Sequence, residues 1–396
     1  MPVGRLWARA RGGSETASFE YAPEWLRDPQ RFELDPELPL GRGQFHTERA
    51  LFNGFTDCAP DRWGQTLLRR HERARARAEG RSPRTLRTID FLTLVSDETR
   101  LGAVRFRDRG GATFLTANSP VPPLILLPRL LRATTAVLED RDTADDLALL
   151  LAPGTSLGGA RPKASVRDVD GRLAIAKFPS RDDDWPITRW EAATLAMADA
   201  AGIEVPPQRM EVVTTRPVLI VQRFDRRQTR RVPYISALTA LAARDGDMRS
   251  YVELAEAIRR LSAAPRADLA QLWRRLVFNI LVSNTDDHLR NHGFLHREGG
   301  WSLAPAFDLN PMPTDVRPRV HALAIDETDQ TASLELARSV IASFGLTSRA
   351  AGVIIREVAR PVTAWRKFAR ARGISNRQLD RMASAFEHDD LAAARA

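Results

Sequence analysis

The chain has 396 residues, of which 43% are apolar and 28% are charged, and this composition excludes the disordered and fibrous classes of protein. Its single cysteine, Cys58, excludes an internal disulfide, and no segment has the roughly 20 apolar residues of a membrane-spanning helix. Because the N-terminal residues also lack the apolar core of a signal peptide, we expect a soluble, cytoplasmic protein of two or three domains.

The net charge of +9 raises the question of nucleic-acid binding, although the basic residues are spread along the whole chain. The densest basic run, at 68–84, has no interleaved aromatic residues and no zinc-ligand spacing. We interpret this run first as the solvated face of a helix. A nucleic-acid contact and a surface for a partner protein are the alternatives.

In chain order, the first part of the sequence (1–110) is predicted to be rich in strands. Short apolar runs separated by Gly, Pro and Asp predict strands at 5–9 and 101–106. The Pro and Asp residues in 57–70 predict the start of a helix. The looser stretch 116–123 follows, and we interpret it as a linker.

The second part (120–228) combines strands with one strong helix. Strands are predicted at 164–166, 173–178 and 217–224, and a helix that ends at a glycine is predicted at 189–201. The order of a glycine-rich turn, a strand with a lysine, a helix with a glutamate and a strand that leads to a hinge is typical of a nucleotide-binding lobe.

The third part (236–396) is predicted to be an all-α lobe. Apolar side chains recur at helical spacing over 269–281, and they predict a buried helix that leads into Asn284. Together the three parts predict an α+β fold with a β-rich N-terminal portion and a helical C-terminal lobe.

An acidic, amide-rich cassette follows that helix, with N-T-D-D-H-L-R-N at 284–291 and A-P-A-F-D-L at 304–309. Asp286 lies five residues before Asn291, and Asp308 follows 17 residues later. In kinase catalytic loops an Asp in this position meets the substrate hydroxyl, and the later Asn and Asp hold Mg²⁺. We therefore predict phosphoryl transfer, with the first of the two adjacent aspartates, Asp286, as catalytic base and with Asn291 and Asp308 as Mg²⁺ ligands.

A phosphate cradle is predicted at 154–163, G-T-S-L-G-G-A-R-P-K. Gly158 and Gly159 allow backbone amides to approach phosphate oxygens. A Walker P-loop is excluded because Ala160 stands where that motif requires lysine. A plain glycine-rich turn between strands is the alternative, and Ser156 in this loop is a candidate phosphorylation site.

Only three of the 59 basic residues are lysines, and Lys163 and Lys177 are two of them. In so arginine-rich a chain a compact ammonium indicates a phosphate contact, with chance placement as the alternative. Lys177 lies in a strand-like run, where it is either the phosphate-binding lysine or an edge residue that reaches solvent. Glu191 is either its ion-pair partner or a carboxylate favoured by a helix dipole.

His288, His292 and His296 are spaced by four residues and raise a competing interpretation, a metal-dependent hydrolase. Gly293 and Phe294 interrupt any helix that would align the three rings. We therefore predict that His288 braces the catalytic loop.

Together these motifs resemble the HipA-like serine/threonine kinases, the toxins of bacterial toxin–antitoxin modules, over nearly the whole chain. S-L-G-G-A-R-P-K resembles the family's nucleotide loop, I-A-K-F-P-S its lysine strand and Q-R-F-D-R its hinge. N-T-D-D-H-L-R-N and L-A-P-A-F-D-L resemble its catalytic and metal segments. Residues 1–110, with F-N-G-F-T-D-C-A-P-D-R-W-G, resemble the domain that precedes its kinase core.

The resemblance implies a two-lobed core like that of the PI3/4-kinases, with ATP and Mg²⁺ as cofactors. By position it makes Lys177 the ATP lysine and makes Gln222 and Phe224 the adenine hinge. Ser156 matches the loop serine whose autophosphorylation inactivates such enzymes. Arg290 stands where many members have lysine, and because arginine also binds phosphate we expect it to contact the nucleotide.

The resemblance also implies partners. Members of the family bind a small helix-turn-helix antitoxin, so we expect contact with DNA only through that protein, and no membrane. They phosphorylate a protein substrate, such as a component of translation. The alternative function is a pseudokinase-like co-repressor module that acts with a DNA-binding antitoxin.

Overall fold

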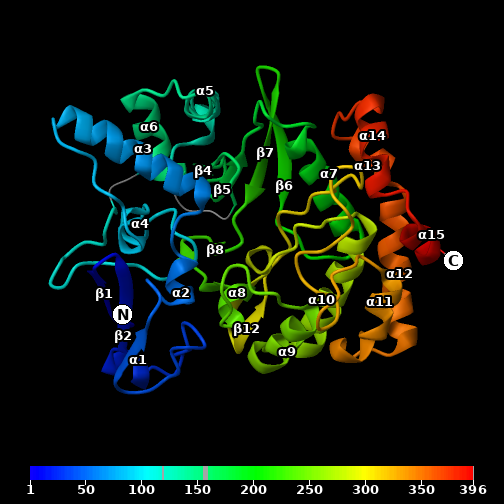
Figure 1. Ribbon diagram of the computed structural model, residues 1–396, viewed down its shortest axis with the longest axis horizontal. Coiled ribbons are helices and arrows are strands. Elements are labelled where there is room, and N and C mark those ends of the chain that lie inside the picture. Colours follow the sequence, from blue (N-terminus) through cyan, green and yellow to red (C-terminus); the bar gives the residue numbers. More distant parts are fainter. Residues whose placement is uncertain (118–119, 155–158, 396) are drawn as a thin grey trace. The chain divides into compact units, whose positions relative to one another are not determined.

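The computed structural model describes residues 1–117, 120–154 and 159–395 (Figure 1). The chain forms two compact units: unit 1 is Met1–Ser180 with Asp225–Ala243, and unit 2 is Arg181–Phe224 with Arg244–Ala396. The predicted nucleotide-binding part, 120–228, is thus divided between the units, and the three-part division of the sequence stays a prediction. No helix in the described ranges is long and apolar enough to cross a membrane.

Unit 1 combines short sheets with helices. Its strands are β1 (Gly4–Arg11), β2 (Ser14–Tyr21), β3 (Gln44–Thr47), β4 (Lys163–Arg167), β5 (Leu173–Lys177), β8 (Arg226–Arg227), β9 (Arg230–Arg231) and β10 (Tyr234–Ser236). Its helices are α1 (Pro23–Arg27), α2 (Asn53–Thr56), α3 (Arg62–Ala78), α4 (Thr88–Leu94), η1 (Leu124–Leu126), α5 (Leu127–Leu138), α6 (Ala144–Gly154) and α8 (Ala237–Ala240). The strands predicted at 5–9, 164–166 and 173–178 are therefore confirmed.

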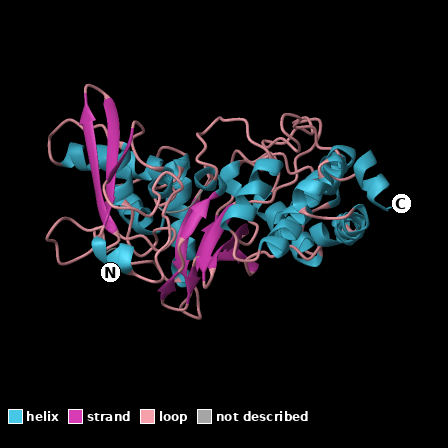
Figure 2. Ribbon diagram, turned by 90° about the horizontal axis from the view of Figure 1, so that it is seen from below, coloured by secondary structure: helices cyan, strands magenta, loops and turns pink. Residues whose placement is uncertain are grey.

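The N-terminal sheet is antiparallel in the order β1-β2-β3. Gly12 and Gly13 make the turn between its first two strands with positive φ angles of 58° and 89°, which glycine adopts without steric cost. The resulting long hairpin lies beside the N mark in Figure 2. One face of the sheet packs on an aromatic core that includes Phe19, Tyr21 and Phe55.

The helix predicted to start within 57–70 is confirmed as α3. Asp61 caps it, because its carboxylate accepts the Gly64 N–H at 2.7 Å. Of the basic run at 68–84, several arginines lie on the exposed face of this helix, while Leu67, Leu68 and Ala76 are buried. The helix packs against α6.

The strand predicted at 101–106 is wrong. Val104 and Phe106 pack on the aromatic core, which explains the apolar alternation, but the backbone makes no strand there. Gly102 has a φ of 74°, and its N–H donates to the buried carboxylate of Asp225 at 2.8 Å. The segment is therefore held as an irregular loop by a side chain that the sequence places far away.

Asp57 fastens residues 225–243 to the N-terminal region. Its carboxylate accepts the Ser236 N–H and O–H, each at 2.7 Å, and the Thr239 O–H at 2.6 Å. All three residues are buried, and 179 residues separate Asp57 from Ser236 in the sequence. This set of charge-assisted hydrogen bonds makes a distant segment part of unit 1.

Unit 2 is largely helical. Its helices are α7 (Ile187–Ala200), α9 (Tyr251–Leu261), α10 (Pro265–Leu281), η2 (Leu289–Asn291), α11 (Leu334–Ser339), η3 (Ile341–Phe344), α12 (Ser348–Thr363), α13 (Trp365–Arg370), α14 (Asn376–Met382), η4 (Ala383–Ala385) and α15 (Asp389–Arg395). Its strands are β6 (Gln208–Val213), β7 (Arg216–Gln222), β11 (Gly293–Arg297) and β12 (Gly300–Leu303). The helix predicted at 189–201 is confirmed as α7, and the strand predicted at 217–224 as β7.

The helix predicted over 269–281 is confirmed as α10 and forms the centre of unit 2. It packs against α9 and α12, which flank it in Figure 1. Its apolar stripe is buried, and Leu272, Trp273 and Leu276 have no exposed surface. At roughly 2 kcal/mol for each fully buried large apolar side chain, this stripe is a major source of the unit's stability.

The prediction of an all-α C-terminal lobe is wrong, because β11 and β12 pair as an antiparallel hairpin. Gly299 and Gly300 allow the tight turn between them with φ angles of 89° and 136°. Phe294 lies opposite Leu303, and both side chains are buried. The strands are only a few residues long, so the periodic signal was too weak to compete with the helices around them.

We expect Asp57→Asn to destabilise unit 1 by about 2 kcal/mol, since the Ser236 and Thr239 donors would lose a charged acceptor while remaining buried. Asp145→Asn, the same change at an exposed aspartate on α6, is the matched control. Thermal and urea unfolding of both variants measure the effect. Equal stability of the two variants would contradict this role for Asp57.

Candidate active site

The predicted catalytic cassette begins where α10 ends. Ser283 has a φ of 51°, which turns the chain out of the helix. The Asn284 N–H donates to the carbonyl of Asn279 at 2.9 Å and closes this turn. The loop that follows is positioned by the buried helix, so its geometry is set by the core of unit 2.

The two adjacent aspartates of the loop face opposite ways. Asp286 is exposed, whereas Asp287 is only 1% exposed. Their neighbours alternate in the same way, because Thr285 is buried and His288 is exposed. Of the pair, only Asp286 is therefore exposed to solvent, and its role as catalytic base stays a prediction.

The buried carboxylate of Asp287 anchors the loop to the core of unit 2. One carboxylate oxygen accepts the Ala322 N–H at 2.8 Å, and the other accepts the Tyr251 O–H at 2.6 Å and lies 2.8 Å from Nδ1 of His321. Burial acts to raise the pKa of Asp287, but His321 and Tyr251 outweigh it and hold that pKa below its usual range. Burial and the charge of Asp287 raise the pKa of Tyr251, so the phenol keeps the proton that it donates.

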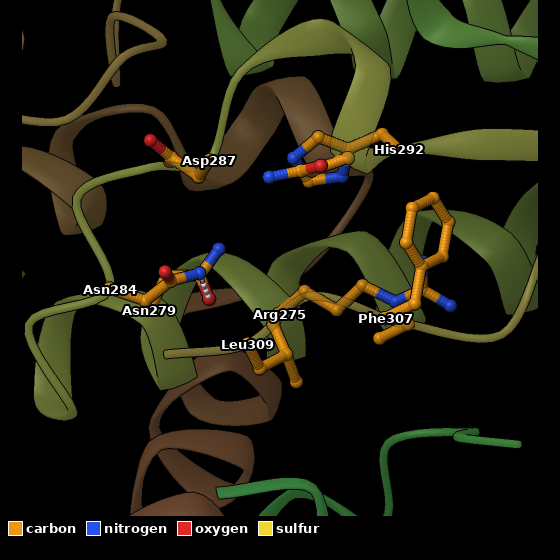
Figure 3. Close-up of a pocket in the computed structure, with 9 residues that line it drawn as sticks. Arg275, Asn279, Asn284, Asp287, His292, Phe307 and Leu309 are labelled. Atoms are coloured by element: carbon orange, nitrogen blue, oxygen red, sulfur yellow. Dashed lines mark hydrogen bonds between the residues drawn. The ribbon is translucent and has the colours of Figure 1, made fainter. Parts of the chain in front are cut away.

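A line of hydrogen-bonded, buried side chains continues from Tyr251. Its hydroxyl accepts a hydrogen bond from Asn279 at 2.9 Å. The Asn279 amide oxygen accepts one from Asn284 at 3.0 Å, and Figure 3 shows this second pair. The Asn284 oxygen in turn lies 3.5 Å from the Asn310 N–H, which donates to it. Asn310 is two residues beyond Asp308, so this line of side chains connects the two predicted metal-binding segments.

Sequence reasoning missed Tyr251, Asn279 and His321. The available signal was weak: Asn279 is a polar residue in the apolar stripe of α10, and such a residue is buried only with hydrogen-bond partners. Tyr251 reads as an ordinary apolar residue at the start of α9.

The Asn291 side chain is hydrogen-bonded to the backbone of Asp286, the predicted catalytic base. Its amide Nδ2 donates to the carbonyl of Asp286 at 2.6 Å, and its backbone N–H donates to the carbonyl of His288 at 2.8 Å. Because the amide nitrogen is committed, the amide oxygen is the atom left to act as a metal ligand. The loop is braced by the backbone of His288, while the imidazole is exposed.

Asp308 has a φ of 53°, in the left-handed region that non-glycine residues enter at an energetic cost. Asn291 and Asp308 offer hard oxygen donors, and Mg²⁺ is commonly held by one or two such residues together with substrate phosphates. This donor set fits that ion. Among the described residues no three His, Cys, Asp or Glu side chains cluster as a metal site.

The three histidines do not form the alternative hydrolase site. His292 is buried against the ring of Tyr251, 5.6 Å between centroids, and burial lowers its pKa to about 4. His296 lies on β11 with its ring edge against Trp301. His288 is exposed, so the three rings lie in different environments.

A small cavity of about 10 Å³, enough for one water molecule, lies behind the loop. It is lined by Arg275, Asn279, Asn284, Asp287, Asn291, His292, Ala306, Phe307 and Leu309, most of which Figure 3 labels. This cavity lies at the base of the candidate site and is too small to be a nucleotide pocket.

The predicted hinge lies close to the segment that carries Asp308. Gln222 ends β7, and its N–H donates to the Pro207 carbonyl at 2.9 Å. The Phe224 ring lies 5.6 Å from the ring of Phe307, the residue before Asp308. Unit 2 therefore brings together the hinge, the catalytic loop and both predicted metal ligands.

Arg290 is oriented by an ion pair. Its Nε and one terminal nitrogen donate to the two carboxylate oxygens of Asp245 at 3.0 and 2.9 Å. Asp245 is well exposed, so solvent weakens this pair and the arginine can exchange it for a phosphate. Its predicted contact with the nucleotide stays a prediction.

The remaining predicted residues belong to unit 1. Lys163 is 3% exposed, and its ammonium lies 2.9 Å from the Asp61 carboxylate and 3.2 Å from the carbonyl of Gly159. Lys177, at the end of β5, pairs with it across the β4–β5 ladder. The buried ion pair gives Lys163 a structural role, and the nucleotide contacts of Lys163, Lys177 and Gly159 stay predictions. Ser156 and Gly158 lie outside the described residues.

Two known proteins show what this chain is similar to. It is 27% identical over 326 residues to the protein named "Putative kinase Y4mE" of Sinorhizobium fredii, which covers 74% of this chain and 71% of the relative. A chain of the Shewanella oneidensis MR-1 toxin–antitoxin complex of HipA, HipB and operator DNA matches 99% of this chain and 94% of its own length. That match has a TM-score of 0.67 at 17% identity, so it shows a shared fold.

The two halves of the sequence match two parts of one family. Residues 1–107 match the HipA N-terminal domain, and residues 155–366 match the HipA-like C-terminal domain. The second match alone spans more than half of the chain and contains the hinge, the catalytic loop and Asp308. The chain is a member of the HipA-like family.

Proposed function

We propose that this protein is an ATP- and Mg²⁺-dependent serine/threonine-protein kinase and the toxin of a toxin–antitoxin module. The observation that carries the proposal is the division of the adjacent aspartates, which leaves Asp286 exposed over a loop anchored by buried Asp287. Asn291 is fastened to the same loop through the Asp286 carbonyl. Membership in the HipA-like family and the kinase name of a relative support the same reaction.

The proposed mechanism assigns each step to a group in this chain. Asp286 orients the substrate hydroxyl and accepts its proton as the phosphoryl group transfers. Bound Mg²⁺·ATP would supply the γ-phosphoryl group and neutralise its charge, with ADP as the leaving group. The oxygens of Asn291 and Asp308 would hold the metal, and Lys177 and Arg290 would contact phosphates.

The adenine site is proposed at the hinge. Gln222 and Phe224 end the strand β7, and the ring of Phe224 against Phe307 supplies an apolar surface on which a flat base can pack. This places the base side of the nucleotide next to the segment that carries Asp308. The PI3/4-kinase-like arrangement of the two lobes belongs to the same proposal.

The proposed partners follow from the family. The Shewanella oneidensis complex contains HipA, HipB and operator DNA, and its HipA-like fold is shared by this chain. We therefore infer a small helix-turn-helix antitoxin as partner, contact with DNA through that antitoxin, and a protein substrate such as a translation component. The cytoplasm is the compartment in which these partners occur.

We expect Asp286→Asn to lower phosphoryl transfer at least about 100-fold, since it removes the proton acceptor while keeping the size of the side chain. Incubation with Mg²⁺ and radiolabelled ATP, followed by intact-mass analysis, measures the phosphate gained by the protein. Asp199→Asn, at an exposed aspartate on α7, is the control and keeps wild-type activity. A wild-type protein that neither gains phosphate nor binds ATP would favour the co-repressor module instead.

We expect the phosphate acquired by autophosphorylation to lie on Ser156. Peptide mass spectrometry of the wild-type protein after incubation with Mg²⁺·ATP locates it, and Ser156→Ala abolishes that phosphopeptide while phosphorylation of added protein continues. A phosphopeptide elsewhere in the chain, with none that contains Ser156, would contradict this assignment.

We expect induced expression of the wild-type chain to arrest bacterial growth and Asp308→Ala to relieve the arrest, since the substitution removes a metal-ligand carboxylate. Colony counts after induction measure the effect, with immunoblots to equalise protein levels and Asp199→Asn as the active control. Growth arrest that persists in Asp308→Ala would separate toxicity from the kinase reaction.

A further inference from the structure

Four polar side chains form an unbroken line through the interior of unit 2. Asp287, Tyr251, Asn279 and Asn284 are each 2% exposed or less. Their successive hydrogen bonds are 2.6, 2.9 and 3.0 Å long, and each is made by side chains at both ends. Such a line is unusual in a core, because most side-chain hydrogen bonds go to backbone or water.

Both ends of the line, Asp287 and Asn284, belong to the cassette 284–291 that carries Asn291, and Asn284 also contacts the segment that carries Asp308. At one end Asp287 sits in the same loop as Asn291, four residues away. At the other end the Asn284 oxygen accepts the Asn310 N–H, just after Asp308. A backbone hydrogen bond of 3.2 Å, from the Met312 N–H to the Ser283 carbonyl, strengthens this second connection.

Tyr251 is the link on which the line depends. Its single hydroxyl donates to Asp287 and accepts from Asn279, so it uses its one proton and a lone pair at once. The residue lies at the start of α9, and its ring is buried between His292 and His321. Neither of these two hydrogen bonds of Tyr251 goes to Asn291 or Asp308.

Resting on the proposed kinase function, we propose that Tyr251 is a positioning residue for the divalent cation. Through Asp287 on one side, and through Asn279 and Asn284 on the other, it fixes the spacing between the loop of Asn291 and the segment of Asp308.

The demand of the cation makes this spacing important. Mg²⁺ requires near-octahedral geometry with ligand distances of about 2.0–2.1 Å, so ligands displaced by a few tenths of an ångström bind it poorly. Outer partners that orient metal ligands typically change metal affinity about 10- to 100-fold when they are removed. Tyr251 acts on the metal ligands only through Asp287, Asn279 and Asn284, so we expect a smaller effect on metal affinity.

The test replaces one oxygen atom. In Tyr251→Phe we expect the dissociation constant for Mn²⁺ to rise about 3- to 10-fold, measured by the electron paramagnetic resonance signal of free Mn²⁺ with saturating non-hydrolysable ATP analogue. The measurement reads metal binding directly and needs no turnover. In kinetic assays the Mg²⁺ concentration for half-maximal rate rises by the same factor, while the rate at saturating Mg²⁺ changes less.

Tyr21→Phe is the matched control. Tyr21 is also buried, and its hydroxyl donates to the Leu38 carbonyl at 2.7 Å and accepts the Leu34 N–H at 3.2 Å. It lies in unit 1, so its loss lowers stability without changing Mn²⁺ binding. If Tyr251→Phe lowers the melting temperature as Tyr21→Phe does and leaves the Mn²⁺ constant unchanged, Tyr251 is only structural and the proposal is overturned.

A second variant covers the case in which Tyr251→Phe fails to fold. Asn284→Ala breaks the same line at its far end and is expected to weaken Mn²⁺ binding by a similar factor. When both variants fold, the double variant is expected to bind no more weakly than the worse single one, because both interrupt one connection. Additive effects would overturn the proposal.

The kinase proposal and this one fail in different ways. If the wild-type protein binds Mn²⁺ with the analogue but transfers no phosphoryl group, the kinase proposal fails while the Tyr251 comparison still decides the positioning role. If the wild-type protein binds no Mn²⁺ with the analogue, both fail.

Discussion

The negative charge of Asp287 is the constraint on which the arrangement of unit 2 depends. A carboxylate that is 1% exposed is tolerated only when several donors surround it, and here they come from α9, from His321 and from the backbone of Ala322. Two separate segments, α9 and residues 321–322, must therefore converge on one side chain. Once Asp287 is held inward, the alternation of the loop sends Asp286 outward, and burial of one aspartate makes the other available.

Spacing could propose a candidate site because part of that site is local in the sequence. Asp286 and Asn291 are five residues apart in one short loop, and the hydrogen bond from the Asn291 amide to the Asp286 carbonyl closes it. A pattern within one loop can be read from sequence alone. The partners of Asp287 cannot, because Tyr251 lies 36 residues before it and Ala322 lies 35 residues after it. Only the folded core decides that these residues meet.

The fold could be predicted where a long periodic pattern of apolar residues has one physical cause, burial in the core. Helix α10 satisfies both conditions, since its stripe of large apolar residues has nowhere to go but the core. The errors at 101–106 and in the β11–β12 hairpin arose in segments only a few residues long. In the first, Val104 and Phe106 pack without pairing. In the second, Gly299 and Gly300 allow a turn whose conformation outweighs weak local preference.

The same reasoning explains why residues 225–243, a part of the C-terminal match, fold with the N-terminal match in unit 1. The N-terminal match supplies Asp57, and Ser236 and Thr239, which it binds, lie in the C-terminal match. Asp225, the residue immediately after the hinge phenylalanine, accepts the Gly102 N–H in the same way. Without the N-terminal residues these buried donors and carboxylates would lose their partners. The segment after Phe224 is therefore shaped by the N-terminal region, and the C-terminal match without residues 1–107 would lack part of its own support.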